Sequence, residues 1–178
     1  MKSLEFLMMI LPVIFMLHDF EEIIMFENWL AKNRIKLKTR FPKIEKFIEK
    51  QGLFKFSTST FAVGVLHEFI LLSGVSLTAT CFGAHGLWFA AFMAYFVHLF
   101  VHLGQWIAYR GYIPVIITTI LTLPYCIYTF IVFWKNAALS ILQMTLWGGI
   151  GVVIMIVTFP ISFLLMSKFN QWQEKRAA

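Results

Sequence analysis

Charged residues are scarce in this 178-residue chain: Asp, Glu, Lys and Arg together make up 13% of it, whereas 60% is hydrophobic. One soluble core of this length cannot bury so many apolar side chains, which excludes an ordinary soluble fold and makes the lipid bilayer the solvent. Short segments that alternate apolar and polar residues are missing, which excludes a membrane β-barrel. The sequence therefore predicts an all-α, polytopic transmembrane helical bundle.

Cysteine is almost absent as well. Cys81 and Cys126 fall in different apolar stretches and form no CxxC pair, so neither a disulfide framework nor a thiolate metal site is indicated. The net charge of +6 is distributed in a way that points to a membrane surface, and we expect membrane lipid rather than nucleic acid as the partner.

Long apolar runs are what the sequence has instead. A helix needs about 20 apolar residues to cross a bilayer. Five runs of this kind predict one integral membrane domain over residues 1–178, with spans at Leu4–Phe26, Ser57–Gly83, Ala84–Ala108, Tyr112–Trp134 and Leu142–Met166. Trp88, Trp106, Trp134 and Trp172 lie near the predicted interfaces, as an aromatic belt would.

Basic residues predict the orientation of these spans. Nine Lys and Arg residues lie in segment 27–56, one follows the third span and three follow the fifth, so thirteen of fifteen share one side; Lys2 and Lys135 lie opposite. By the positive-inside rule that side is cytoplasmic. We expect a multi-pass protein of the cytoplasmic (inner) membrane, with the N-terminus outside and the C-terminus in the cytoplasm.

Segment 27–56 has a helical pattern of its own. Leu37, Phe41, Ile44 and Ile48 recur at spacings of four, three and four, and Pro42 suits a first helical turn. The pattern predicts an amphipathic helix on the inner leaflet that ends near Gly52. Such a helix would either anchor the chain to anionic lipid or cover a site that opens to this leaflet.

Ionisable residues inside the spans need an explanation, because each costs several kcal/mol in lipid unless it is paired, hydrated or metal-bound. In the first span His18, Glu21 and Glu22 project to one side, with Asp19 at the flank. The full set of candidate metal ligands from three spans is His18, Glu21, Glu22, His67, Glu68, His98 and His102.

Spacing and depth both favour a shared centre. His98 and His102 are one helical turn apart, which lets two imidazoles bind one ion, whereas adjacent His67 and Glu68 diverge, so only one of them can face it. At 1.5 Å per residue, the four histidines lie roughly 9–15 Å from the predicted cytoplasmic ends. The competing interpretation is that these groups only pair and hydrogen-bond to hold the bundle together.

The run His18-Asp19-Phe20-Glu21-Glu22 resembles the signature of the HXXEE-domain proteins, a bacterial membrane family without an established function. That family's pattern also includes a YXPG element. The nearest match here, Tyr112-Ile113-Pro114-Val115, lacks the glycine. The resemblance extends over the first three or four spans.

Imidazole and carboxylate ligands suit zinc, iron or manganese. A mononuclear site would use three histidines with Glu22 or Glu21 as general base, the arrangement of a hydrolase; a dinuclear site would use both glutamates as ligands and suits an oxidase. The sequence thus indicates a metal-dependent enzyme that acts on a lipid-like or hydrophobic substrate from the cytoplasmic side. A metal-ion or proton transporter and a haem-binding protein are the alternatives.

Overall fold

The structure is a computed structural model that describes residues 3–136 and 138–177, so Lys2 lies outside the described residues. This part of the chain is all-helical. Six α-helices and one 3₁₀ turn follow in the order α1 (Ser3–Arg40), α2 (Pro42–Lys50), η1 (Leu53–Lys55), α3 (Thr58–Phe82), α4 (His85–Tyr109), α5 (Ile116–Lys135) and α6 (Ile141–Ala177).

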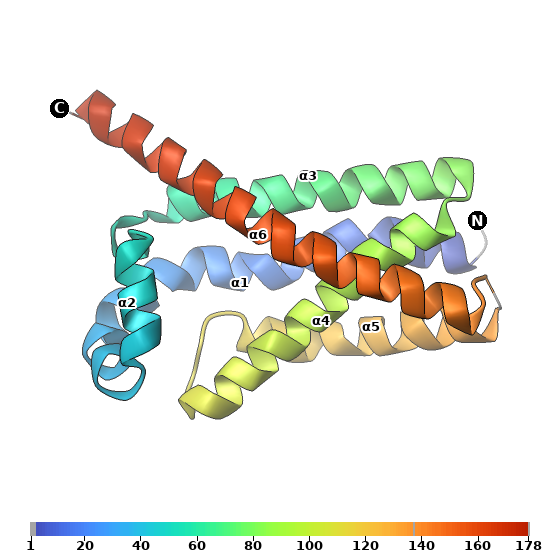
Figure 1. Cartoon of the computed structure of the whole chain (residues 1–178), viewed down its shortest axis with the longest axis horizontal. Coiled ribbons are helices and arrows are strands. Elements are labelled where there is room, and N and C mark those ends of the chain that lie inside the picture. Colours follow the sequence, from blue (N-terminus) through green and yellow to red (C-terminus); the bar gives the residue numbers. More distant parts are fainter. Residues whose placement is uncertain (1–2, 137, 178) are drawn as a thin grey trace.

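The five predicted membrane spans are confirmed as helices. In the described residues, α1, α3, α4, α5 and α6 are long and apolar enough to cross a bilayer. Figure 1 shows α1, α3 and α5 running side by side while α4 and α6 cross them obliquely. The chain is therefore a multi-pass membrane protein by the length and composition of its helices.

The most basic segments lie together at one end of the bundle. The segment with α2, the connection between α4 and α5, and the C-terminal end of α6 all lie at the left in Figure 1. This placement agrees with the charge pattern of the sequence. That this end faces the cytoplasm stays a prediction.

Helix α1 continues past Phe26, where its membrane span was expected to end, and runs to Arg40. Leu30 and Leu37, seven residues apart, are both buried in this extension. Phe41 leaves the helical conformation because it precedes Pro42, which starts α2. Leu37 thus belongs to α1 rather than to the predicted amphipathic helix, and contact of α2 with the inner leaflet stays a prediction.

Carboxylates of α1 cap two neighbouring helices. Glu27 accepts hydrogen bonds from the backbone N–H of Thr58 at 2.7 Å and from its hydroxyl at 3.0 Å, at the start of α3. Ser57 completes this cap by accepting from the N–H of Thr60. Negative charge is favourable at a helix N-terminus, so α1 fixes where α3 begins.

Helices α4 and α6 approach unusually closely. A Cβ atom placed on Gly151 of α6 would lie 2.1 Å from the carbonyl oxygen of Ala90 in α4. Only glycine therefore permits this crossing, as is common where transmembrane helices pack backbone to backbone.

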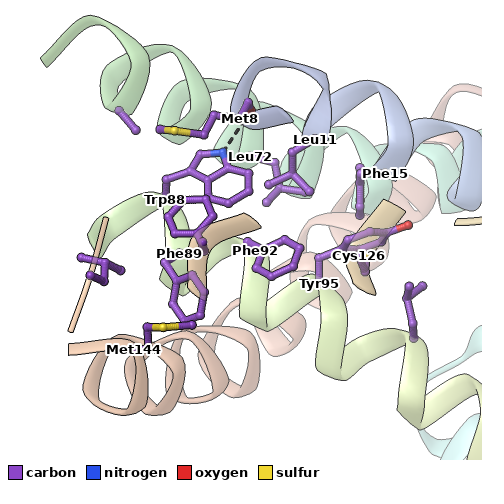
Figure 2. Packing of buried hydrophobic residues seen from close by; sticks show 14 of the residues in the cluster. Met8, Leu11, Phe15, Leu72, Trp88, Phe89, Phe92, Tyr95, Cys126 and Met144 are labelled. Atoms are coloured by element: carbon purple, nitrogen blue, oxygen red, sulfur yellow. Dashed lines mark hydrogen bonds between the residues drawn. The ribbon is translucent and has the colours of Figure 1, made fainter. Parts of the chain in front are cut away.

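Trp88 corrects the predicted aromatic belt. Its side chain is fully buried, stacked on Phe92 and Phe133 with centroids 5.2 and 5.1 Å away. Its indole N–H donates to the carbonyl oxygen of Met8 at 3.0 Å, as Figure 2 shows. In a regular helix that carbonyl would accept from residue 12, which is Pro12 and has no N–H. Trp88 thus satisfies a backbone group that the proline leaves open in α1.

We expect Trp88→Phe to lower the free energy of unfolding by about 1–3 kcal/mol, because it keeps an aromatic ring but leaves the Met8 carbonyl unsatisfied. Unfolding of the purified protein in mixed detergent measures this loss. Pro12→Ala restores the intrahelical donor, so the same tryptophan change should cost clearly less in that background. Equal costs in both backgrounds would contradict the assigned role of Trp88.

Candidate metal centre

Three histidines from two helices meet in the interior. His18 of α1 and His98 and His102 of α4 each offer a ring nitrogen, and these three atoms lie within 4.8 Å of one another. His18 and His102 are buried and His98 is partly buried. Their ring centroids are 4.2–5.6 Å apart. We call this group the histidine triad.

The hydrogen bonds of the triad leave several nitrogens open. The Nε2 atoms of His98 and His102 are 2.8 Å apart. Neither ring nitrogen of His18 has a hydrogen-bond partner among the described residues, and nor does Nδ1 of His98. Buried imidazole nitrogens without partners are costly, so the triad has the chemistry of a site that is completed by an additional group.

A single metal ion fits this arrangement. Nitrogens bound to one tetrahedral zinc ion at about 2.0–2.1 Å lie ~3.4 Å apart. Because the three nitrogens of the triad lie within 4.8 Å of one another, side-chain movements of up to about 1.4 Å, shared between two residues, bring them to this separation. A buried triad of His18, His98 and His102 can hold an ion, and neutral imidazole is a ligand that suits zinc and iron.

Gln105 orients one of the three ligands. His102 Nδ1 lies 3.0 Å from Oε1 of Gln105, one turn further along α4. Because an amide oxygen only accepts, Nδ1 of His102 carries the proton and Nε2 keeps its lone pair for the centre of the triad. Metal-binding histidines are commonly fixed in this way by a partner on the second nitrogen.

Asp19 is the residue that the sequence placed only at the flank. Its side chain is buried, and its Oδ1 atom lies 3.7 Å from Nε2 of His18. Oδ1 has no hydrogen-bond partner in the described part of the chain. Asp19 thus brings an oxygen without a partner to the side of one imidazole of the triad.

Glu21 and Glu22 have different surroundings although they are adjacent. Glu21 accepts from the N–H and the hydroxyl of Thr118 at 2.8 and 2.7 Å, and from the hydroxyl of Tyr112 at 2.8 Å. It thus caps the start of α5. Glu22 instead lines the large cavity described next. The metal and catalytic roles expected of Glu21 and Glu22 stay predictions.

A cavity of about 380 Å³ lies beside the triad, between α1, α3, α4 and α6. His98 lines it, together with Asp19, Glu22, Glu68 and Ser162, and most of the remaining wall is apolar. This volume is within the usual range for small-molecule sites.

His67 and Glu68 lie in a second polar group. His67 Nδ1 is 2.8 Å from the Ser162 hydroxyl, and that hydroxyl donates to Glu68 Oε1 at 2.8 Å. His67 is thus not a member of the triad, and its role as a ligand stays a prediction, as does that of Glu68. Sequence reasoning missed Ser162; its only signal was a hydroxyl within the fifth apolar run, four residues from Thr158.

Membrane-spanning helices around a buried histidine triad define a multi-pass membrane protein with a candidate intramembrane metal centre. The chain belongs to the family described as "Protein of unknown function with HXXEE motif", whose model matches residues 9–129. The resemblance of the His18–Glu22 run to that family is thereby confirmed. No curated protein and no solved structure matches the chain.

We expect the purified wild-type protein to contain about one equivalent of zinc, iron or manganese by elemental analysis, because one triad offers one centre. The double change His98→Ala with His102→Ala should abolish this content. His67→Ala is the matched control, since it removes an intramembrane imidazole outside the triad and should leave the content unchanged. Retention of metal by the double variant would exclude the triad as the binding site.

Glu21→Ala should lower the free energy of unfolding by roughly 1–3 kcal/mol, because the Thr118 N–H and two hydroxyls lose a charged acceptor. Its metal content should stay at the wild-type level. Thermal unfolding in detergent and elemental analysis of the same sample give both quantities. Loss of metal from a stably folded Glu21→Ala protein would instead make Glu21 a ligand.

Proposed function

We propose that this protein is an intramembrane, metal-dependent hydrolase that acts on a hydrophobic substrate. The observation that carries the proposal is that His98, one member of the buried histidine triad, lines a largely apolar cavity that Glu22 also lines. A site of three protein ligands with an open position is the arrangement typical of catalytic rather than structural zinc.

Three features favour hydrolysis by one ion over oxidation by two. The triad supplies three nitrogens for one centre. Glu21, which a dinuclear site would need as a ligand, already accepts three hydrogen bonds at the start of α5. His67 is likewise engaged with Ser162. The remaining ligand set supports a mononuclear centre.

A divalent ion held by His18, His98 and His102 would supply a Lewis acid at the cavity wall. Glu22 would act as the general base: it accepts a proton from water as the water oxygen attacks the carbonyl carbon of the substrate. The bond from that carbon to the leaving nitrogen or oxygen then breaks, and Glu22 returns the proton to the leaving group. The products are a carboxylic acid and an amine or alcohol.

The substrate class follows from the surroundings of the cavity. Its walls are contributed mainly by helices long and apolar enough to span a membrane, and the proposed substrate is therefore a molecule that partitions into lipid. Access from the cytoplasmic side is part of the proposal, because the basic end of the bundle is the end expected there.

Glu22→Gln should lower turnover by at least about 100-fold, because removal of a general base typically costs 10²–10⁴-fold. Zinc-loaded protein in detergent would be incubated with neutral long-chain esters and amides, and acids released would be quantified by mass spectrometry. Metal content and the unfolding midpoint should match the wild type. Glu21→Gln, the same change one residue earlier, is the matched control and should retain most of the turnover.

Two results would overturn the proposal. Equal turnover by the Glu22→Gln and wild-type proteins would remove Glu22 as the base. Metal-dependent uptake of zinc into proteoliposomes, with no product from any ester or amide, would make the protein a transporter.

A further inference from the structure

The cavity beside the triad is elongated, and its polar groups lie near the middle. Its lining on α3 runs from Phe61 to Val75, which is ~21 Å of helix, and Glu68 lies seven residues from each end. Ser162 of α6 is level with Glu68, because the two side chains are hydrogen-bonded at 2.8 Å. The polar level of the cavity thus has ~10 Å of lining on either side.

Helix α1 places its own polar group at the same level. Phe26 of α1 stacks on Phe61 of α3, with ring centroids 4.4 Å apart. Asp19 is seven residues before Phe26, and Glu68 is seven residues after Phe61, so the antiparallel helices bring both carboxylates to one height. His98 joins them from α4, with its ring 5.3 Å from that of Phe159, three residues before Ser162.

Both ends of the cavity are apolar. Toward the α2 end the lining consists of Phe26, Leu53, Phe61, Phe163 and Met166, and toward the opposite end of Phe15, Leu72, Val75, Leu87 and Ile154. Lys and Arg are missing from the lining within the described residues. An anionic headgroup would find no Lys or Arg partner and would lie beside the acidic side chains of Asp19, Glu22 and Glu68, which disfavours a phospholipid. An apolar arm, by contrast, fits at either end.

The middle of the cavity offers hydrogen-bond acceptors. The Ser162 hydroxyl gives its single proton to Glu68, so Nδ1 of His67 must be the donor in the contact with Ser162. Glu68 and Ser162 both line the cavity, and each keeps acceptor lone pairs beyond these two contacts. A ligand therefore has to bring an N–H or O–H to this level.

We infer that the cavity binds a neutral molecule in which one secondary amide joins two apolar arms, with the amide at the level of Glu68, Ser162 and Asp19. Its N–H faces Glu68 and Ser162, and its carbonyl faces the side of the triad, whereas each arm occupies one apolar end. The inference rests on the proposed function for the fate of this amide, but binding itself requires neither metal nor turnover.

Binding is tested on metal-free wild-type protein in detergent, with tritiated N-octyl octanamide in a scintillation proximity assay. Octyl octanoate and N-methyl-N-octyl octanamide keep both arms but lack the N–H, and should compete roughly tenfold more weakly. Octanamide, which has one arm, and a lysophosphatidylglycerol should not compete. The inference would be overturned if the ester and the N-methyl amide competed as strongly as unlabelled N-octyl octanamide. Effective competition by octanamide or by the lysophospholipid would overturn it as well.

Variants locate the binding within the cavity. Ser162→Ala should weaken binding of N-octyl octanamide about five- to tenfold, whereas Ser73→Ala, which changes a serine of α3 outside the lining, should not alter it. Ala91→Phe narrows one apolar end, and should weaken the two-armed probe at least tenfold while N-ethyl octanamide still binds. Circular dichroism and metal content identify folded variants. Unchanged binding by both folded cavity variants would place the probe elsewhere.

The outcomes separate this inference from the proposed hydrolase. Tight amide binding without any product from the zinc-loaded protein would contradict the proposed hydrolase activity and support the inferred binding site. Metal-dependent hydrolysis of esters, with no preference for the secondary amide in binding, would contradict the inferred binding site and support the proposed hydrolase activity.

Discussion

The interior of a bilayer contains no water, and the architecture of this protein depends on that constraint, because every polar group in the spans must find its partner within the protein. The carbonyl of Met8, which Pro12 deprives of its usual donor, accepts from Trp88. The starts of α3 and α5 are satisfied by carboxylates of α1. In the described part of the chain, buried side-chain atoms without a partner occur on the hydroxyls of Tyr95, Thr119 and Thr129 and on His18, His98 and Asp19. The last three residues lie together, and this clustering indicates a ligand.

The residues of the His18–Glu22 run have three different roles. His18 enters the triad, Glu21 fixes the start of α5, and Glu22 lines the cavity. Helical geometry explains the division, since residues three and four apart share a face but still diverge by tens of degrees. A short motif can thus combine a structural cap with a reactive site, and its members should not be assumed to share one role.

The number of spans was predictable because apolar length is a property of the chain alone, and the meeting of His18 with His98 and His102 followed from depth and one-turn spacing. Other features required tertiary information. Whether His67 or Glu68 faces the cavity depends on the rotation of α3 against α6, which no local pattern encodes. The capping by Glu21 depends on a threonine 97 residues later. Trp88 resembles an interfacial residue until its donor is matched to the proline in another helix.

One glycine limits the width of the cavity beside the triad. Helix α6 carries Ser162 and much of the apolar wall, and its distance from α4 is limited by Gly151 lying against the Ala90 backbone. Any larger residue at this position would push α4 and α6 apart where they cross. The cavity would then widen, although Gly151 is not part of its lining. The width of the cavity, and with it the width of a molecule that fits, therefore depends on a residue outside its lining.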